Sequence, residues 1–351
     1  MESEPVQFLW RRFEERLDPA RAVLARFVGA RARDLVFVSN ATTGVNAVVR
    51  SLKLKRGDEL LTTDQDYNAC HNVLVEVARR AGARVVTARI RFPLRSEEEI
   101  IEPILKCVSA RTRLAMIDHV TSNAAVVFPI KRIIQELAAR NVDTLVDGAH
   151  APGMVPLKIE ALQPAYYTGN LHKWVCAPKG AAFLWARGDR QEGLQPAVIS
   201  HGNNRPRKGY SGFQDRFDWA GTVDPTAWFC VGEAIDWMGR LLPGGWPEIR
   251  RRNHALAVSA RALLCERLGV EAPCPDKMLG SMAAIPLPAS WQDRTARGKI
   301  DSEQLRLYDE FGIEVPLSRH GLPERRWVRV SAQLYNTLAD FEYLASALSE
   351  T

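Results

Sequence analysis

Short apolar runs alternate with amphipathic stretches through the first half of the chain, and this alternation limits the fold more than any other feature. The runs have the length of strands, and the stretches between them repeat apolar residues at the 3.6-residue spacing of helices. Strands are predicted over residues 35–38, 59–62, 84–87, 113–117 and 144–146, and helices over residues 70–80, 97–108 and 130–140. This alternation is typical of an α/β fold with a mainly parallel central sheet and helices on both of its faces.

The two ends of the chain have a different texture. Residues 6–28 have the pattern of a helix that breaks or restarts at Pro19. Past about residue 190 loops dominate, and they lead to helices over residues 226–241 and 247–268 and then to short strands with two more helices. We therefore predict two domains, a large α/β domain that includes the N-terminal helix (residues 1–225) and a small α+β domain (residues 226–351).

Composition excludes several classes of protein. The chain has 351 residues, of which 46% are hydrophobic and 25% charged, as expected for a soluble protein with a sizeable core. Its net charge of +6 raises the question of nucleic acid, but the arginines are interleaved with acids. The dense basic clusters at residues 205–208 and 250–252 have no aromatic recognition motif beside them, so we interpret them as solvated faces. We expect no nucleic-acid partner.

The sequence also bears on where the protein is located and on the state of its cysteines. No apolar run approaches the roughly 18 uncharged residues of a membrane span, so no membrane partner is expected. The N-terminus has neither the basic nor the apolar region of a secretion signal. Six cysteines are scattered without a metal-binding spacing, which favours reduced thiols, no metal and a cytoplasmic location.

Lys173 is the first candidate for catalysis. It follows a strand-like segment, residues 165–168, and a Gly169-Asn170 turn, and its neighbours are His172 and Trp174. A lysine among aromatic side chains loses part of its hydration, which lowers its pKa and makes the neutral, nucleophilic amine available as a Schiff-base former. The alternative interpretation is an ordinary surface lysine in a loop.

Asp147 strengthens the case for Lys173. This acid ends the predicted strand over residues 144–146, at the edge of an α/β sheet where ligands bind. A carboxylate that keeps a pyridine nitrogen protonated makes pyridoxal phosphate an electron sink, while a lysine amine holds the cofactor's aldehyde. Asp147 and Lys173, in this order and with room for one strand-loop-strand excursion between them, therefore predict pyridoxal 5'-phosphate as cofactor.

The segments around these two residues resemble the class V aminotransferase group of pyridoxal-phosphate enzymes. Asp-Gly-Ala-His-Ala-Pro-Gly at residues 147–153 and Thr-Gly-Asn-Leu-His-Lys-Trp at residues 168–174 are similar to those of the isopenicillin N epimerase-like branch. The resemblance implies the fold of type I pyridoxal-phosphate transferases, a homodimer with shared active sites and an amino-acid-like substrate.

The resemblance also implies roles for further residues. Tyr67 would stack on the cofactor ring, and His150 would bind its phenolic oxygen; a buried structural tyrosine and a capping or core histidine are the alternatives. Arg329 would bind the substrate carboxylate, and an arginine between two valines of a strand is unusual on burial grounds. Contacts to the cofactor, mainly to its phosphate, would come from Thr42, Thr43, Ser122, Asn170, His172 and, lent by a neighbouring subunit, Thr222.

Two segments depart from the family's pattern. Residues 121–125 read Thr-Ser-Asn-Ala-Ala where relatives tend to carry Thr-Ser-Pro-Thr-Gly, which bears on the expected contact of Ser122. At Thr42 and Thr43 a plain helix cap is the alternative to phosphate binding. The Asn-His-Gly-Ser-Phe-Gly turn that usually precedes the first helix of relatives is absent from the sequence. A truncated protein that binds cofactor without turnover is therefore kept as the non-enzyme alternative.

The reaction stays open among outcomes that share one scaffold. Lys173 would act as general base or acid at Cα, and epimerisation, β-elimination or transamination would follow from the geometry of the pocket. We favour isopenicillin N epimerase-like chemistry, with a C–S lyase or desulfhydrase, or an aminotransferase, as the alternative. A desulfurase with a persulfide on cysteine is disfavoured, because residues 316–325, where such relatives carry the cysteine, contain none.

Overall fold

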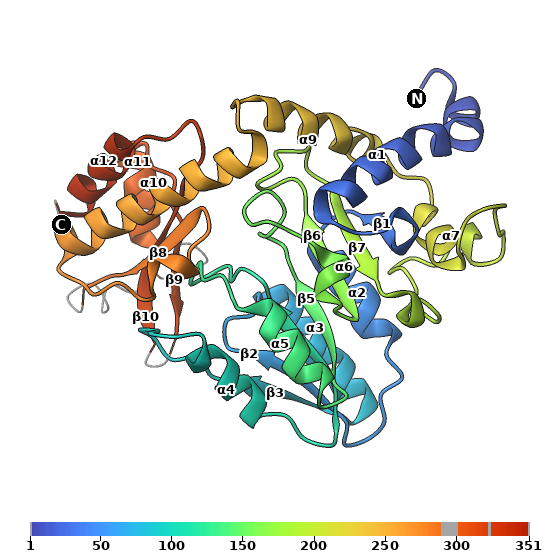
Figure 1. Cartoon of the computed structure of the whole chain (residues 1–351), viewed down its shortest axis with the longest axis horizontal. Coiled ribbons are helices and arrows are strands. Elements are labelled where there is room, and N and C mark those ends of the chain that lie inside the picture. Colours follow the sequence, from blue (N-terminus) through green and yellow to red (C-terminus); the bar gives the residue numbers. More distant parts are fainter. Residues whose placement is uncertain (1, 289–300, 322–323, 350–351) are drawn as a thin grey trace.

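The computed structural model describes residues 2–288, 301–321 and 324–349, and in this part of the chain seven strands form the central sheet. Their order is β1-β7-β6-β5-β4-β2-β3, and neighbours are parallel except where β7 is involved (Figure 1). The strands are β1 (Leu35–Val38), β2 (Glu59–Thr63), β3 (Arg84–Ala88), β4 (Thr112–Asp118), β5 (Asp143–Asp147), β6 (Tyr166–Asn170) and β7 (Ala182–Ala186). The predicted α/β fold with a mainly parallel sheet is confirmed.

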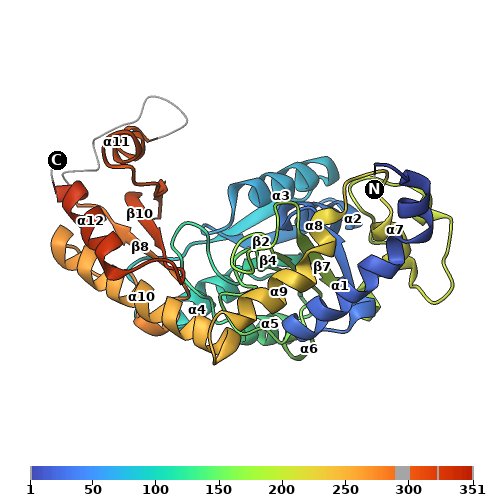
Figure 2. The same cartoon turned by 90° about the horizontal axis from the view of Figure 1, so that it is seen from above.

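Helices cover both faces of this sheet because strand side chains alternate between them. In β1, Leu35 and Phe37 join one apolar core, and Val36 and Val38 join the other. The first core is completed by α1 (Phe13–Val28), α4 (Glu98–Lys106), α5 (Ile130–Ala138) and α6 (Ile159–Leu162), and the second by α2 (Ala41–Ser51), α3 (Asn68–Ala81) and α7 (Gly212–Asp218). Figure 2 shows the two helix layers on opposite sides of the strands.

The first helix continues through Pro19, so the predicted break at this residue is wrong. The interruption lies at Arg12, between the π-helix η1 (Gln7–Arg11) and α1. A proline inside a helix costs about 3 kcal/mol. Full burial of side chains such as Leu17 and Leu24 on the same helix, each worth about 1.5–3 kcal/mol, offsets that cost.

A second, smaller sheet follows the large one. Its antiparallel order is β8-β10-β9, and α10 runs from the large sheet's side of the molecule to this sheet (Figures 1 and 2). The remaining elements are α8 (Thr226–Phe229), α9 (Val231–Arg240), α10 (Gly245–Leu268), β8 (Met282–Pro286), α11 (Ser302–Phe311), β9 (Leu317–His320), β10 (Arg325–Ser331), α12 (Leu338–Ser349) and the short 3₁₀ helices η2 (Ala32–Asp34), η3 (Gly188–Arg190), η4 (His201–Asn203) and η5 (Asp276–Met278). Helix α9 of the predicted small domain packs against α1 of the predicted large domain. The predicted domain boundary near residue 225 therefore stays a prediction.

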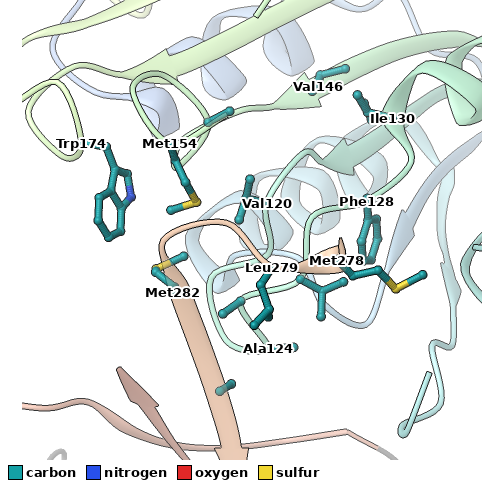
Figure 3. Packing of buried hydrophobic residues seen from close by; sticks show 14 of the residues in the cluster. Val120, Ala124, Phe128, Ile130, Val146, Met154, Trp174, Met278, Leu279 and Met282 are labelled. Atoms are coloured by element: carbon teal, nitrogen blue, oxygen red, sulfur yellow. The ribbon is translucent and has the colours of Figure 1, made fainter. Parts of the chain in front are cut away.

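The two sheets share one apolar core. The segment after β4 forms a bridge to the start of the small sheet, in which Val126 pairs with Leu279 and the Val127 N–H donates to the Met278 carbonyl at 2.8 Å. Figure 3 shows Met278 and Leu279 beside Phe128 and Ala124 of the segment after β4, and Met282 beside Met154. Residues of β10 are thereby held at a fixed place relative to the ends of the central strands.

Helix α2 crosses β6 at very short range, and Gly44 makes this possible. A Cβ at this position would lie 2.3 Å from Thr168 Oγ1 and 2.9 Å from Thr168 Cβ. Thr168 cannot turn aside freely, because its hydroxyl donates to the Phe183 carbonyl at 2.8 Å. The start of α2 therefore sits directly on the central sheet.

We predict that Gly44→Ala destabilises the protein although alanine is the better helix former. Overpacking costs about 1–3 kcal/mol, which exceeds the gain of up to about 1 kcal/mol in helix propensity. Denaturant unfolding should show the lower free energy of unfolding. Gly188→Ala is the matched control, because nothing lies within 4 Å of its added Cβ. Equal stability of the two variants would contradict the tight crossing.

Candidate active site

A cavity of about 530 Å³ opens at the carboxyl ends of the central strands, where ligands bind in open α/β sheets. The wall of the cavity is formed by the start of α2 and by the segments that follow β2, β4, β5 and β6. The predicted residues that line it are Thr42, Thr43, Tyr67, Ser122, Asp147, His150, Asn170, His172 and Lys173. The fold thus gathers residues spread over more than a hundred positions of the chain into one place.

The Lys173 amine lies at the centre of this cavity's polar groups. Its Nζ is 2.9 Å from His150 Nε2, and the Trp174 indole N–H donates to His150 Nδ1 at 3.4 Å. Because the indole can only donate, Nδ1 accepts, and a neutral His150 then carries its proton on Nε2, from which it can donate to the lone pair of the unprotonated lysine amine. Burial, with an opposing effect of Asp147 and a further lowering by Arg329, brings the pKa of Lys173 down to about 8.

His150 is held in its neutral form by the same surroundings. Burial, followed by the charges of Lys173 and Arg329, places the pKa of His150 well below its ordinary value. An uncharged imidazole next to an amine with a lowered pKa makes a poor ion pair but a good hydrogen bond. The pair can therefore hold or pass a proton with little change in net charge.

Asp147 is buried at the end of β5 with two donors. Its Oδ1 accepts the Ala149 N–H at 3.0 Å, and its Oδ2 accepts the Cys70 thiol at 3.3 Å. The pKa of Asp147 is raised overall, because burial outweighs the opposing effects of both hydrogen bonds and of the charge of Lys173. A buried carboxylate with this few donors has lone pairs left for a cationic N–H group, such as a protonated pyridine nitrogen.

The start of α2 borders the cavity and is capped by two asparagines. Asn40 accepts the Thr43 N–H at 2.8 Å as the N-cap, and the Asn170 side chain of β6 accepts the Ala41 N–H at 2.8 Å. Asn40 is thus the helix cap, the role that the sequence left open for Thr42 and Thr43. The hydroxyls of both threonines remain at the cavity wall, where an anion would meet the positive end of the helix dipole.

Tyr67 and His172 lie at the wall of the cavity. Tyr67 follows β2 and lines the cavity, and no other side chain buries it, since it is 49% exposed. His172 is half-buried, and its Nδ1 has no hydrogen-bond partner among the described residues. Burial, and then the charge of Lys179, lowers the pKa of His172. The stacking and phosphate roles of the two residues stay predictions.

Arg329 approaches the cavity from β10 of the small sheet. Its Nη1 donates to the Ser122 carbonyl at 2.5 Å and to the Ser122 hydroxyl at 3.2 Å. Its buried Nε has no hydrogen-bond partner among the described residues. Ser122 was predicted to contact the cofactor; in the structure its hydrogen bonds hold the guanidinium, and the cofactor contact stays a prediction.

The loop that carries Ser122 keeps a left-handed turn without glycine. Ala125 has a φ of 57°, at the position where the family tends to carry glycine. The Thr121 side chain accepts the Val126 N–H at 3.0 Å, and the Thr121 N–H donates to the Val126 carbonyl at 3.0 Å. These bonds stabilise the turn against a strain on the order of 1 kcal/mol or more.

Thr222 is not among the residues that line this cavity within its own chain. Its segment borders a neighbouring cavity of about 440 Å³ through Ala220 and Val223, and the two cavities share Thr43 and Ala197. The prediction that a neighbouring subunit lends Thr222 to the site is therefore left open.

Several residues of the site were missed from the sequence. Asp118 ends β4 as Asp147 ends β5, and this repeated pattern of an acid after an apolar strand could have found it. Asn40 had the signal of a helix cap, a polar residue before a helix. Cys70 had no sequence signal, because it is one apolar position of α3 among others. Within the described ranges, no group of three or more metal-ligating side chains was found, and no helix has the length and hydropathy of a membrane span.

The polar groups of the cavity fit pyridoxal 5'-phosphate. Asp147 suits the ring nitrogen, and the hydroxyls at the start of α2 suit the phosphate. Lys173 suits the aldehyde. His172, which lines the cavity, and Arg329, which is bonded to the lining residue Ser122, each have a nitrogen without a hydrogen-bond partner among the described residues, as expected where a polar ligand completes the hydrogen bonds.

Comparison with known proteins agrees with this chemistry. The model of the family "Aminotransferase class-V" matches residues 6–344. Isopenicillin N epimerase of Amycolatopsis lactamdurans is 35% identical over 366 residues, which cover 100% of this chain and 88% of that protein. Putative L-cysteine desulfhydrase 1 of Oryza sativa subsp. japonica is 31% identical, over 99% of this chain and 77% of that protein.

Solved structures support the fold. The apo structure of a cysteine desulfurase from Thermococcus onnurineus NA1 matches with a TM-score of 0.77 at 20% identity, over 96% of this chain and 84% of that one. The cystine C–S lyase C-DES, in complex with its product cysteine persulfide, also gives 0.77 at 20% identity, over 96% and 87%. The predicted family and cofactor are thereby confirmed: the chain belongs to the class V aminotransferase family and is a pyridoxal-phosphate-dependent enzyme.

Proposed function

We propose that this enzyme acts at the Cα atom of an amino acid or amino-acid-like substrate, with isopenicillin N epimerase-like chemistry. The observation that carries the proposal is the Lys173 amine, which is half-buried, has a pKa lowered to about 8, and lies 2.9 Å from a neutral histidine. Near neutral pH a usable share of such an amine is unprotonated and can accept a proton from carbon.

The cofactor would be held by residues of the large sheet's side. Asp147 would bind the pyridine nitrogen, His150 the phenolic oxygen and Tyr67 the ring face. The phosphate would lie at the start of α2, near Thr42, Thr43, Asn170 and His172, with Thr222 contributed by a second copy of the chain. When bound, the cofactor supplies an electron sink for charge that develops at Cα.

Arg329 would bind and orient the substrate through its carboxylate. Ser122 accepts hydrogen bonds from Nη1, whereas the buried Nε has no partner among the described residues, and the guanidinium edge that includes Nε would supply two donors to a carboxylate. Arg329 is also close enough to Lys173 to lower its pKa. A carboxylate on Arg329 would therefore place the adjacent Cα near the amine that moves the proton.

We rank the possible reactions by the similarity of this chain to its relatives. Epimerisation is favoured because both isopenicillin N epimerases, 33–35% identical, match over almost the whole chain. A C–S lyase or desulfhydrase is the second candidate, because plant proteins named L-cysteine desulfhydrase match over the same span at 28–31% identity. Transamination is the third candidate reaction.

We further propose that the protein is cytoplasmic and forms a homodimer.

Two assays on one preparation would distinguish the first two reactions. For an epimerase we expect exchange of the Cα hydrogen with solvent deuterium, together with loss of optical purity and no release of ammonia. For a desulfhydrase we expect ammonia, sulfide and a keto acid from cysteine. Absence of Cα exchange with every amino acid and short peptide that alters the cofactor's absorbance would contradict the proposed epimerisation.

The cofactor should be attached to Lys173 and not to its neighbour Lys179. Borohydride reduction followed by peptide mapping should find the pyridoxyl group on Lys173, because this amine lines the cavity and has the lowered pKa. Lys179 is the internal control, since it lies on the same loop with its Nζ donating to the His172 carbonyl. A label on Lys179, or bleaching that survives Lys173→Ala, would overturn the assignment.

Arg329→Lys should weaken substrate use while leaving the absorbance of the bound cofactor unchanged. Lysine keeps the charge but not the planar pair of donors, and losing one charge-assisted hydrogen bond costs about 1.5–3 kcal/mol. We expect a fall in kcat/KM of about tenfold or more, mostly through KM. Arg113→Lys is the control, because Arg113 is an exposed strand arginine paired with Asp58. Equal kinetics in both variants would place the carboxylate elsewhere.

A further inference from the structure

A second buried carboxylate, Asp118, lies beside Asp147. The two residues end adjacent parallel strands and are partners in register, so their side chains leave the same face of the sheet. Asp118 is 4% exposed and Asp147 is 3% exposed, and both line the cofactor cavity. Neither the family assignment nor the proposed function gives Asp118 a role.

The two acids differ in their hydrogen bonds. Asp147 receives the Ala149 N–H and the Cys70 thiol, which stabilise its ionised form. Asp118 Oδ1 is buried and has no hydrogen-bond partner among the described residues. An unpartnered buried oxygen is costly for a carboxylate and much less so for a neutral carboxyl group. If one of the pair holds a proton, it is therefore Asp118.

The charges around Asp118 favour the same distribution. The titratable groups that face it are Asp147 of β5, Asp66 of the turn after β2, Lys173 of the loop after β6 and Cys70 of α3. Burial, followed by Asp147 and Asp66, raises the pKa of Asp118 well above its ordinary value, and Lys173 lowers it only in part. Asp66 has a partner of its own in His71, whose Nδ1 lies 2.8 Å from Asp66 Oδ2. One lysine amine, itself partly neutral, then remains for the two acids Asp118 and Asp147 and cannot balance both charges.

We propose that Asp118 is a positioning residue that holds a proton in the resting holoenzyme and so confines the negative charge of the acid pair to Asp147. The ring nitrogen of the cofactor is then drawn to one carboxylate, at the end of β5, and not to a charge shared over two strands. The inference rests on the cofactor site of the proposed function, but it concerns a proton on the protein itself.

Asp118→Asn is the informative variant, because asparagine has nearly the shape of a neutral carboxyl group and does not titrate. The folded protein favours the protonated form, so the stability of the parent is fully present below the ordinary pKa of aspartate and falls as the pH rises toward the raised folded pKa. Over that window each pH unit should raise the parent's unfolding equilibrium constant about tenfold relative to Asp118→Asn.

Asp34→Asn is the matched control. Asp34 is as buried, at 3% exposed, but Arg31 Nε lies 2.9 Å from its Oδ2 and Gln191 donates to its Oδ1 at 2.7 Å. Asparagine should lose the ion pair there, so this variant should be less stable than the parent. The two substitutions are chemically identical and are expected to act in opposite directions.

The experiment compares the holoenzymes of the parent, Asp118→Asn, Asp147→Asn and Asp34→Asn by unfolding across pH and by infrared spectroscopy. The C=O stretch of a protonated carboxyl group should appear in the parent and be absent in Asp118→Asn. In Asp147→Asn it should be lost at lower pH than in the parent, because that variant lacks the neighbouring charge that helps raise the pKa of Asp118. The proposal is overturned if Asp118→Asn keeps that band, or if at neutral pH it is less stable than the parent, as Asp34→Asn is expected to be. No substrate is needed, so failure of the proposed reaction would leave these readouts intact.

Discussion

The register of three parallel strands is the constraint on which the site depends. Asp118 of β4, Asp147 of β5 and Thr168 of β6 are paired in sequence along one line across the sheet. Each does a different task there: Asp147 presents a charge, Thr168 sets the closest approach of α2, and Asp118 adds a second acid. A shift by one residue in any of these strands would turn its side chain to the opposite face. The register of these strands therefore fixes both the acids of the site and the packing of α2 on the sheet.

Two buried carboxylates on adjacent strands, Asp118 and Asp147, raise the electrostatic energy of the folded protein. Two ionised carboxylates about 5 Å apart repel by roughly 3 kcal/mol at an effective dielectric constant of 20, before the cost of burying either. Asp147 has two donors and the field of Lys173 against this cost, whereas the structure gives Asp118 Oδ1 none among the described residues. Neutralisation of the less supported acid is the cheaper solution, and it leaves one charge where one cationic ring nitrogen would bind.

The sequence predicted the sheet, its helices and most residues of the cavity because these depend on local patterns. An acid that ends an apolar strand, as Asp147 does, is visible in the sequence, and the resemblance supplied Lys173's neighbours. Contacts between distant segments were not visible. The bond from Arg329 to Ser122 joins β10 of the small sheet to the segment after β4. The Cys70 thiol reaches Asp147 from α3, a helix that packs against α2, β2 and β3. Pro19 was misread because a local penalty was outweighed by tertiary burial.

The shared apolar core links the small sheet to the chemistry. Val127 and Leu279 lock the loop of Ser122 to the start of β8, and Ser122 in turn holds Arg329. Arg329 lowers the pKa of Lys173 through its charge, and a substrate carboxylate on Arg329 would cancel most of that effect. The amine would then become a stronger base when a carboxylate-bearing substrate is in place. Proton transfer at Cα would thereby be favoured only after the substrate is oriented, and the hydrophobic contacts between the two sheets would set how strongly binding and basicity are linked.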